Sequence, residues 1–281
     1  MIRQAIRSRI KGYSILFGSA YFIFLLILTI FQKNFLFMPD AQQISPARVG
    51  LSKFESITIQ TSDNEQLVSW YKKPVKNGKV ILFFHGNGGN NPVYNQTIKE
   101  LEPLADGFLI IDYRGFGGST GTPSAEGLFK DAEAALKYLE EQGIKPEQLI
   151  ISGISLGTGL AVHVAQKTQA SAVILIAAYS SLADIIKDRF FFYPGSVLDA
   201  LLKNDINAIE KISKIKTPLV IVHGTKDTVI SYSLAKKLYS AANEPKMLIS
   251  LPGYDHVLPV TNETLSQIRE FLNSHWKSSE E

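Results

Sequence analysis

The sequence has no cysteine among its 281 residues. Disulfide bridges, thiolate nucleophiles and cysteine-ligated metal sites are therefore excluded, although the cellular compartment is left open. A large excess of one charge is also lacking, because 29 lysines and arginines against 26 aspartates and glutamates leave a net charge of +3. Much of that excess precedes an apolar run, at Arg3, Arg7, Arg9 and Lys11. So weak a positive charge argues against a nucleic-acid-binding surface.

Residues 12–31, GYSILFGSAYFIFLLILTIF, contain no charged side chain. A helix of this length spans about 30 Å, the thickness of the hydrocarbon core of a bilayer, so the run is interpreted as one transmembrane anchor. A cleaved signal peptide is the alternative, but the run is longer than a usual signal sequence and residues 32–35 offer no small-x-small cleavage site. Only Lys33 follows the run closely. The positive-inside rule therefore predicts a cytoplasmic N-terminus and places the remaining chain on the periplasmic, lumenal or extracellular side.

The anchor divides the chain into successive segments. A basic segment over residues 1–11 precedes it, and a polar linker over residues 32–53 follows it. One domain is predicted over residues 54–276, and a short tail over residues 277–281 ends the chain. A hydrophobic fraction of 45% with 20% charged residues is typical of a folded protein, and this length is sufficient to bury a large core.

Strands and helices alternate along the predicted domain. The first two strands alternate apolar and polar residues around a turn-forming segment, which predicts a β-hairpin. The later strands are continuous apolar runs separated by helical patterns, which predicts parallel strands covered on both faces. Strands are predicted over residues 56–60, 66–71, 80–84, 108–112, 148–152, 172–176, 218–222 and 246–251. Helices are predicted over residues 124–141 and 160–165, and around Leu265, Ile268, Phe271 and Leu272. The predicted fold class is α/β, with an eight-stranded, mostly parallel sheet and helices on both faces.

A Gly-x-Ser-x-Gly pattern, Gly153-Ile154-Ser155-Leu156-Gly157, lies between a predicted strand and a predicted helix. This is the pattern of a nucleophile elbow, in which a tight turn raises a serine above the sheet. Glycine is needed on both sides because a larger side chain would collide with neighbouring backbone. The amide of Leu156 can then face an incoming carbonyl oxygen. The pattern alone is weak, and the strand before it and the helix after it give it weight.

A glycine-rich loop, HGNGGN over residues 85–90, follows the strand over residues 80–84. Three glycines, Gly86, Gly88 and Gly89, let backbone amides converge on one point, which suits the second donor of an oxyanion hole. The predicted donor is the amide of Asn87, and Gly86 and Gly88 are singled out as site glycines. A phosphate-binding loop is disfavoured because neither a G-x-G-x-x-G pattern nor a P-loop lysine is present. His85 is predicted to shape the loop through a hydrogen bond.

Two further strands are followed by polar residues at the same edge of the sheet, where ligands bind in such folds. The chain order Ser155, Asp227, His256 is the order in which α/β-hydrolases deliver their triad. A serine hydroxyl needs a base to take its proton, and a carboxylate fixes the imidazole tautomer. Asp255 is the alternative carboxylate, but side chains of adjacent loop residues seldom face each other, so Asp227 is preferred.

The other histidines and one arginine are assigned structural roles. His163 lies within a predicted helix and is expected to be packed. His223 ends a strand beside a glycine turn, which favours a structural hydrogen bond. His275 is near the C-terminal tail and is expected to be solvated. Arg114 lies in the turn DYRGFGG and is predicted to brace loops.

Five motifs occur in a specific order: HGN at 85–87, DYRGFG at 112–117, GISLG at 153–157, HGTKD at 223–227 and GYDH at 253–256. From about residue 35 to residue 272, the chain resembles the membrane-anchored α/β-hydrolase domain-containing serine hydrolases, a branch that includes protein depalmitoylases and many uncharacterised bacterial members. The resemblance implies a charge relay of Ser155, Asp227 and His256. Such proteins often carry a Ser-Pro-Phe-Thr stretch where this chain has AYSS at residues 178–181, so the substrate preference of the family transfers poorly to this chain.

A short lid is expected over about residues 183–217, the usual insertion site in this fold. It contains the aromatic run FFFYP at residues 190–194. Buried packing is the default explanation for such side chains. The functional hypothesis is an apolar acyl pocket or a surface that contacts lipid.

Together these features predict a membrane-tethered serine hydrolase that cleaves carboxylic esters or thioesters through an acyl-enzyme. The predicted substrates are acyl esters or thioesters of small molecules, lipids or acylated proteins, and the predicted partner is the bilayer. A serine peptidase with the same triad and a non-catalytic membrane-anchored binding module are the alternatives. No metal, organic cofactor or nucleic acid is implied. The acyl chain, the leaving group and the oligomeric state are not determined by the sequence.

Overall fold

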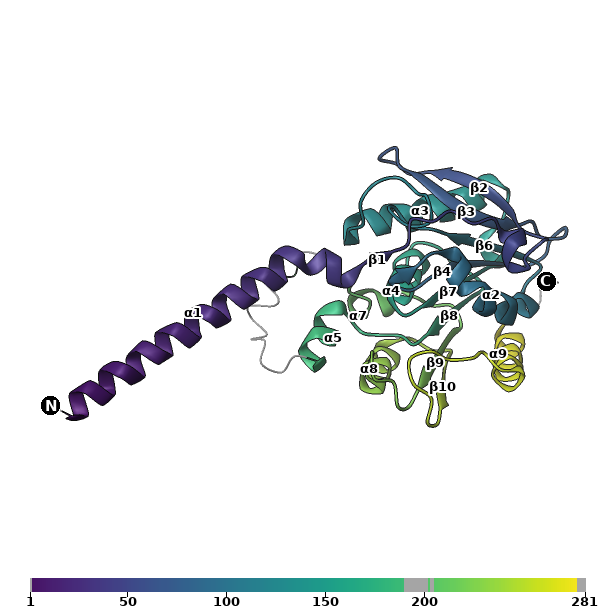
Figure 1. The fold of residues 1–281 in the computed structure, drawn as a ribbon. Coiled ribbons are helices and arrows are strands. Elements are labelled where there is room, and N and C mark those ends of the chain that lie inside the picture. The colour runs from purple at the N-terminus through teal and green to yellow at the C-terminus, as the bar shows by residue number, and fades with distance from the viewer. Residues whose placement is uncertain (1, 190–201, 203–204, 277–281) are drawn as a thin grey trace.

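The computed structural model describes residues 2–189, 202 and 205–276. An α/β body surrounds a central sheet, and one long helix, α1 (Ile2–Leu36), projects away from that body (Figure 1). The carboxyl ends of the parallel strands and the loops that follow them are the part of the body that positions the predicted site.

Eight strands form the central sheet in the order β10-β9-β8-β7-β4-β6-β3-β2. Neighbours from β10 to β6 are parallel, whereas β3 pairs antiparallel with both β6 and β2. The bounds are β2 (Glu55–Gln60), β3 (Gln66–Lys72), β4 (Val80–Phe84), β6 (Gly107–Ile111), β7 (Leu149–Ile154), β8 (Ala172–Ile176), β9 (Leu219–Gly224) and β10 (Lys246–Leu251). Every residue of β4, β6 and β8 is buried, as expected for apolar strands covered on both faces. The predicted α/β class, the hairpin and the predicted strands are confirmed.

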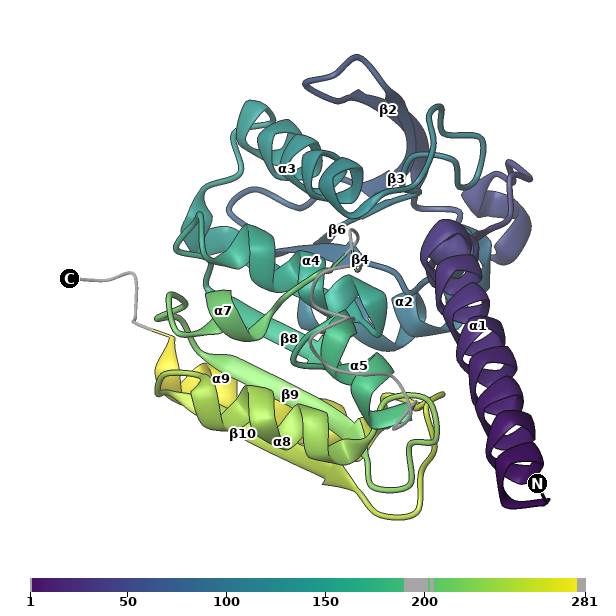
Figure 2. The ribbon, with the colours of Figure 1, turned by 90° about the vertical axis from the view of Figure 1, so that its left-hand side faces the viewer.

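Helices cover both faces of the sheet (Figure 2). One apolar core joins the sheet to α3, α4, α7 and α8, and a second core on the opposite face joins it to α2 and α9. The bounds are α2 (Asn95–Leu101), α3 (Ala125–Glu141), α4 (Leu156–Ala165), α5 (Leu182–Arg189), α7 (Ile209–Ile212), α8 (Tyr232–Ala241) and α9 (Asn262–His275). The Ser124 hydroxyl accepts a hydrogen bond from the Gly127 amide at 3.1 Å, so α3 begins where its cap predicts. In contrast, α4 begins at Leu156, earlier than predicted, because Ser155 occupies its N-cap position.

A second, two-stranded sheet joins β1 (Met38–Pro39) in parallel to β5 (Gly88–Gly89). The segment predicted as a linker over residues 32–53 is therefore not a free connector. Its first residues belong to α1, and later ones rest on the body through Phe37 and Leu51, which are buried. Strands of two residues have no periodicity, so the sequence pattern does not reveal them.

Helix α1 contains the predicted anchor over residues 12–31 and extends beyond it at both ends. In the part of the chain that the structure describes, no helix is long and apolar enough to cross a membrane. The helix predicted over residues 12–31 is confirmed. Large apolar side chains of α1 are exposed, including Phe17 at 71% and Phe22 at 67%.

The predicted lid over about residues 183–217 is described in part. Its aromatic run at residues 190–194 lies outside the described residues. At its start, Ala183 and Ile186 of α5 pack against Leu25 of α1, together with Leu202. The first lid helix and α1 are therefore in contact.

Arg114 links the edge hairpin to α3. Its guanidinium donates to both carboxylate oxygens of Asp63, in the turn between β2 and β3, at 3.0 Å each. It also donates twice to Asp131 of α3, at 2.9 and 2.8 Å. Asp131 is fully buried, and burial raises the pKa of Asp131 against the opposing effect of Arg114. The predicted bracing role of Arg114 is confirmed.

Replacing Arg114 with methionine is expected to lower the free energy of unfolding by about 3–5 kcal/mol, because the variant leaves the buried Asp131 carboxylate without its charged partner. Urea unfolding measures the change. Lys130→Met is the matched control, since Lys130 contacts the same Asp63 carboxylate at 3.3 Å but is partly exposed to solvent, and a solvent-accessible ion pair contributes little. Equal losses in the two variants would contradict the bracing role.

Candidate active site

Ser155 lies in a sharply turned backbone between β7 and α4. Its φ of 52° and ψ of −121° fall in a region that residues other than glycine rarely adopt. A Cβ on Gly153 would lie 2.3 Å from the Gly157 carbonyl oxygen, and a Cβ on Gly157 would lie 2.0 Å from the Phe84 carbonyl oxygen. Both positions therefore accept only glycine. The turn holds the Ser155 hydroxyl at the carboxyl edge of the sheet.

The structure brings three predicted side chains together although they are far apart in the sequence. His256 Nε2 lies 3.1 Å from Ser155 Oγ, and His256 Nδ1 lies 2.8 Å from Asp227 Oδ2. Asp227 follows β9 and His256 follows β10. Because β7, β9 and β10 run in the same direction, their ends deliver all three residues to one edge of the sheet.

Asp227 is held as an ionised carboxylate. Its Oδ1 accepts hydrogen bonds from two backbone amides at 2.8 and 2.7 Å. Burial on its own raises the pKa of Asp227, but hydrogen bonds from His223, His256 and the Ile230 amide outweigh burial and lower this pKa below its usual range. The ionised Oδ2 accepts a hydrogen bond from His256 Nδ1–H, which leaves the Nε2 lone pair facing the Ser155 hydroxyl. This arrangement allows Nε2 to accept the hydroxyl proton during attack on a carbonyl carbon.

His223 also contacts the Asp227 carboxylate. Its Nε2 lies 3.3 Å from Asp227 Oδ2 and 3.0 Å from the Ile230 carbonyl oxygen. The structural hydrogen bond predicted for His223 is therefore present, and its position against Asp227 is an additional finding. Asp255, the alternative carboxylate, instead accepts hydrogen bonds from the amide and hydroxyl of Thr228 at 2.7 and 2.9 Å.

Two further histidines lie away from this group. His163 is 9% exposed, stacks on Phe129 and has its Nε2 2.7 Å from the Glu133 carboxylate, so the packing expected for it is confirmed. His275 is exposed near the end of α9, where its Nδ1 contacts the Phe271 carbonyl oxygen at 2.7 Å. The solvated position expected for His275 is also confirmed.

The loop after β4 has a hydrogen-bond donor for each carbonyl oxygen from His85 to Gly89. The donors are Tyr113 Oη to His85 at 2.7 Å, His85 Nδ1 to Gly86 at 2.7 Å, the Met38 amide to Asn87 at 2.9 Å, Tyr94 Oη to Gly88 at 2.9 Å and the Asp40 amide to Gly89 at 3.0 Å. A Cβ on Gly86 would lie 3.5 Å from Ser155 Cβ, so the loop lies beside the elbow. Within the described residues, the amides of Asn87 and Leu156 donate no hydrogen bond. Both predicted oxyanion donors are therefore unoccupied.

The glycines of this loop differ in how far they are required. A Cβ on Gly86 would lie 2.8 Å from Tyr94 Oη, which excludes a side chain in the present arrangement. Gly89 has a φ of 82°, in the left-handed region that favours glycine. Gly88, one of the two glycines that the sequence singles out, would have its nearest neighbour, the Met38 side chain, 3.9 Å from an added Cβ. The space around position 88 therefore accepts a side chain, whereas positions 86 and 89 favour glycine.

A buried histidine and a buried aspartate lie next to each other at the loop after β4. His85 and Asp112 are almost completely buried, and His85 Nε2 lies 3.7 Å from Asp112 Oδ1. Burial lowers the pKa of His85 to about 4, so the ring stays neutral and its Nδ1 proton is donated to Gly86 as predicted. Burial also raises the pKa of Asp112 to about 8, and its Oδ1 accepts one hydrogen bond, from the Asn91 amide at 2.7 Å. Asp112 begins the DYRGFG motif, but nothing in that motif indicates that its carboxyl group is buried.

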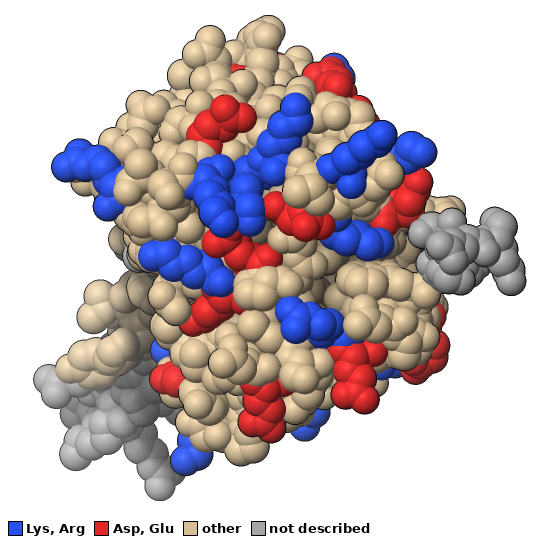
Figure 3. Space-filling view, turned by 90° about the vertical axis from the view of Figure 1, so that its right-hand side faces the viewer, with Lys and Arg blue, Asp and Glu red and all other residues tan. Residues whose placement is uncertain are grey.

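The charge on the surface is mixed. On the face turned away from α1, lysines and arginines alternate with aspartates and glutamates (Figure 3). Among the described residues, no group of three or more histidines, cysteines, aspartates and glutamates is placed to hold a metal ion.

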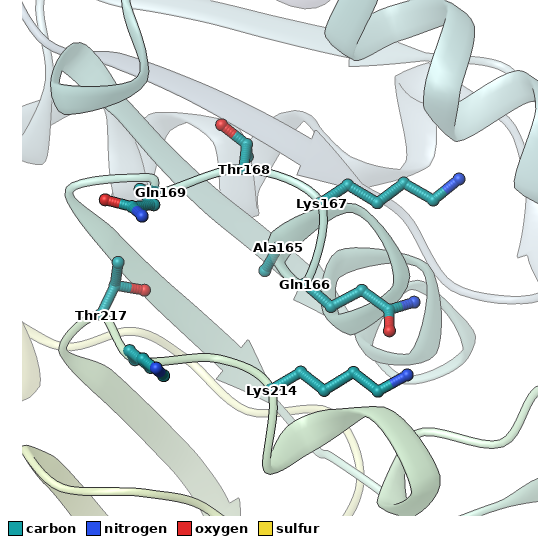
Figure 4. A pocket seen from close by; sticks show the side chains of 8 residues that line it. Ala165, Gln166, Lys167, Thr168, Gln169, Lys214 and Thr217 are labelled. Atoms are coloured by element: carbon teal, nitrogen blue, oxygen red, sulfur yellow. The ribbon is translucent and has the colours of Figure 1, made fainter.

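A separate cavity of about 410 Å³ lies at the other edge of the sheet. Its lining comes from the end of α4 and from the segments that lead into β8 and β9, and includes Lys167, Lys214 and Thr217 (Figure 4). Lys167 and Lys214 extend to the same side of this cavity (Figure 4). The side chains grouped around Ser155 follow the opposite ends of the strands, so this cavity is not part of the predicted site.

Comparison with known proteins assigns the fold to a family. Residues 79–204 match the family described as alpha/beta hydrolase fold. The chain is 30% identical over 247 residues to the uncharacterized protein Rv2307c of Mycobacterium tuberculosis, which covers 86% of this chain and 87% of that protein. It is 35% identical over 199 residues to the lysophosphatidylserine lipase ABHD12 of Danio rerio, which covers 64% of this chain and 51% of that protein. The chain belongs to the α/β-hydrolase family.

A solved structure shares the fold. The esterase Pf2001 of Pyrococcus furiosus matches with a TM-score of 0.66 over 86% of this chain and 98% of that chain, at 19% identity. So low an identity supports a common architecture and leaves the reaction to be argued from the site.

The raised pKa of Asp112 predicts a specific dependence of stability on pH. Between about pH 4 and pH 8 the unfolded chain releases the Asp112 proton while the folded chain keeps it, so this group costs the folded state stability as the pH rises. Asp112→Asn removes this titration. The free energy of unfolding of the wild type relative to Asp112→Asn should therefore fall from pH 5 to pH 8, by at most about 1.4 kcal/mol per pH unit.

Urea unfolding of both proteins across this pH range measures the difference. Asp188→Asn, at an exposed aspartate of α5, is the control and should run parallel to the wild type. A wild type that runs parallel to Asp112→Asn as well would show that Asp112 is ionised throughout.

Proposed function

We propose that this protein hydrolyses carboxylic ester or thioester bonds through an acyl-enzyme on Ser155. The observation that supports this best is the hydrogen-bonded series from Asp227 through His256 to Ser155, at 2.8 and 3.1 Å. As Ser155 Oγ attacks the carbonyl carbon, His256 Nε2 takes its proton and Asp227 stabilises the resulting imidazolium. The amides of Leu156 and Asn87 donate to the oxyanion of the tetrahedral intermediate.

The reaction then proceeds in two stages, release of the leaving group and hydrolysis of the acyl-enzyme. His256 gives its proton to the leaving oxygen or sulfur, so an alcohol or a thiol departs and the acyl group remains on Ser155. His256 next takes a proton from a water molecule, whose oxygen attacks the acyl carbon. The second tetrahedral intermediate releases the carboxylic acid and regenerates the Ser155 hydroxyl.

For the substrate class, we propose acyl esters of small molecules or lipids. The named activity of ABHD12, a lysophosphatidylserine lipase with 35% identity over the matched residues, supports a lipid ester. The same serine, histidine and aspartate can also cleave a peptide bond, so a peptide substrate is the rival outcome to be tested.

The proposed nucleophile is tested by fluorophosphonate labelling and by turnover of a panel of acyl esters, acyl thioesters and peptides. Ser155→Ala should abolish labelling and lower kcat by roughly 10⁴- to 10⁶-fold, the range seen when such a nucleophile is removed. Ser274→Ala, at an exposed serine of α9, should label and turn over like the wild type.

Three results would overturn parts of this proposal. A folded wild type with neither labelling nor turnover would point to a binding module. Labelling that persists in Ser155→Ala would place the nucleophile elsewhere. Turnover of peptides without esters or thioesters would establish a peptidase.

We propose further that α1 attaches the domain to a membrane, with the domain on the non-cytoplasmic side. Support comes from the uncharged run over residues 12–31, from the exposure of apolar side chains such as Phe17 and Phe22, and from the projection of α1 away from the body (Figure 1). An apolar surface of this kind on a soluble body marks an interaction with lipid or protein.

Membrane attachment is tested by cell fractionation followed by a high-salt wash. The wild type should stay with the membranes, whereas Phe17→Lys combined with Phe22→Lys should shift it to the soluble fraction, since each lysine places a charge on the apolar surface proposed to contact lipid. Asn273→Lys, at an exposed position of α9, is the control. Equal partitioning of all three proteins would contradict attachment through α1, and protease treatment of sealed vesicles reports the side.

A further inference from the structure

We propose that residues 38–42, here called the strap, are a positioning element that keeps the oxyanion hole formed. The strap is the chain that leaves α1, and none of its side chains lies in the group around Ser155. The inference rests on the proposed function, because it concerns the Asn87 amide in its role as an oxyanion donor.

Four hydrogen bonds made by main-chain groups of the strap connect it to the loops around the elbow. Two are the pairing of β1 with β5, from the Met38 amide to the Asn87 carbonyl at 2.9 Å and from the Asp40 amide to the Gly89 carbonyl at 3.0 Å. The other two run from Asn90 Nδ2 to the Gln42 carbonyl at 2.7 Å and from the Gly117 amide to the Asp40 carbonyl at 2.8 Å. The strap is thus bound along its whole length.

One of these bonds holds the peptide group after Asn87, and a bond from the hydrolase body holds the peptide group before it. The preceding peptide carries the Asn87 amide, and its carbonyl, on Gly86, accepts from His85 Nδ1 at 2.7 Å. The following peptide carries the Asn87 carbonyl, which accepts from the Met38 amide. With both carbonyls held by donors, the backbone dihedrals of Asn87 are determined, and its amide is left free to face a ligand on Ser155.

The glycines in the loop after β4 explain why hydrogen bonds are needed to hold its conformation. Gly86, Gly88 and Gly89 give the backbone around Asn87 a wide choice of conformations. An oxyanion donor contributes most when it is already oriented before the reaction begins. Of the five carbonyls from His85 to Gly89, the hydrolase body holds three and the strap holds the other two.

The strap is itself anchored at both ends. Phe37, directly before it, is 4% exposed within the apolar core, and Gln42, at its far end, accepts from the buried Asn90. In contrast, the Met38 side chain is 54% exposed. The Met38 amide can therefore be removed by substitution with little loss of side-chain packing.

The central experiment compares Met38→Pro with Met38→Ala in the full chain. Proline removes the amide that holds the Asn87 carbonyl, whereas alanine removes the side chain and keeps the amide. Met38→Pro should lower kcat for an acyl ester roughly ten- to a hundredfold, less than the loss of an oxyanion donor outright, with KM within about twofold of the wild type. Met38→Ala should match the wild type in both constants. Ala41→Pro is the second control, because the Ala41 amide donates no hydrogen bond among the described residues.

A transition-state analogue separates positioning of the donor from a general disturbance of the fold. A trifluoromethyl ketone forms a hemiketal with Ser155 whose oxyanion needs the Asn87 amide, so its inhibition constant should weaken in Met38→Pro by the same factor as kcat/KM. An unchanged inhibition constant, or a kcat equal to that of Met38→Ala, would overturn the inference.

A second pair of variants keeps the test decisive if Met38→Pro fails to fold. Asn90→Ala removes the side-chain bond to the strap, and Asn95→Ala removes a bond of the same type, from Asn95 Nδ2 to the Pro92 carbonyl at 2.8 Å, outside the strap. Asn90→Ala should lower kcat roughly three- to tenfold, the effect of one hydrogen bond, and Asn95→Ala should not. Equal kcat values for these two variants would overturn the inference, and turnover by the wild type would leave the proposed function standing.

Discussion

The close contact between the turn from β7 to α4 and the end of β4 governs the geometry of the site. Gly157 lies so near the Phe84 carbonyl that no side chain fits between them. This contact brings the start of α4 against the loop that follows β4, so Ser155 and Asn87 come from neighbouring strands. A backbone conformation like that of Ser155 costs roughly 1–3 kcal/mol. The fully buried strands β4 and β8, on either side of β7, supply the rigid support that keeps it in place.

Two buried aspartates, Asp227 and Asp112, show how the surroundings of a carboxyl group set its charge. Asp227 and Asp112 are both withdrawn from water, yet the pKa of Asp227 lies below its usual range and the pKa of Asp112 is raised to about 8. Asp227 receives hydrogen bonds from two amides and contacts two imidazoles, whereas Asp112 accepts from the Asn91 amide. Asp227, with more donors and shallower burial, is an ionised residue that orients His256. Asp112, with one donor and deeper burial, is a protonated residue that supports a loop.

The sequence was sufficient to predict the features that depend on side-chain pattern. The strands were predictable because their apolar runs are continuous, and the grouping of Ser155, Asp227 and His256 followed from their positions after parallel strands. Features that depend on backbone contacts or on burial were not predictable. The strands β1 and β5 are too short to show a periodic pattern. The contact between His223 and Asp227 depends on the conformation of the turn after β9, which no sequence pattern indicates. The segment over residues 32–53 has a polar composition, although its Phe37 and Leu51 are buried in the body.

The strap has a consequence for how the protein tolerates change over evolution. Its two bonds to the loop after β4 are made by main-chain amides, so the side chains at positions 38 and 40 can vary without breaking them. Pro39 occupies the one position between those two amides, where an N–H is not required for the pairing. The number of residues in the strap is constrained, because an insertion or deletion of one residue would turn the paired amides away from their carbonyls. Comparison of relatives should therefore find the length between α1 and the body more constant than the amino acids that fill it.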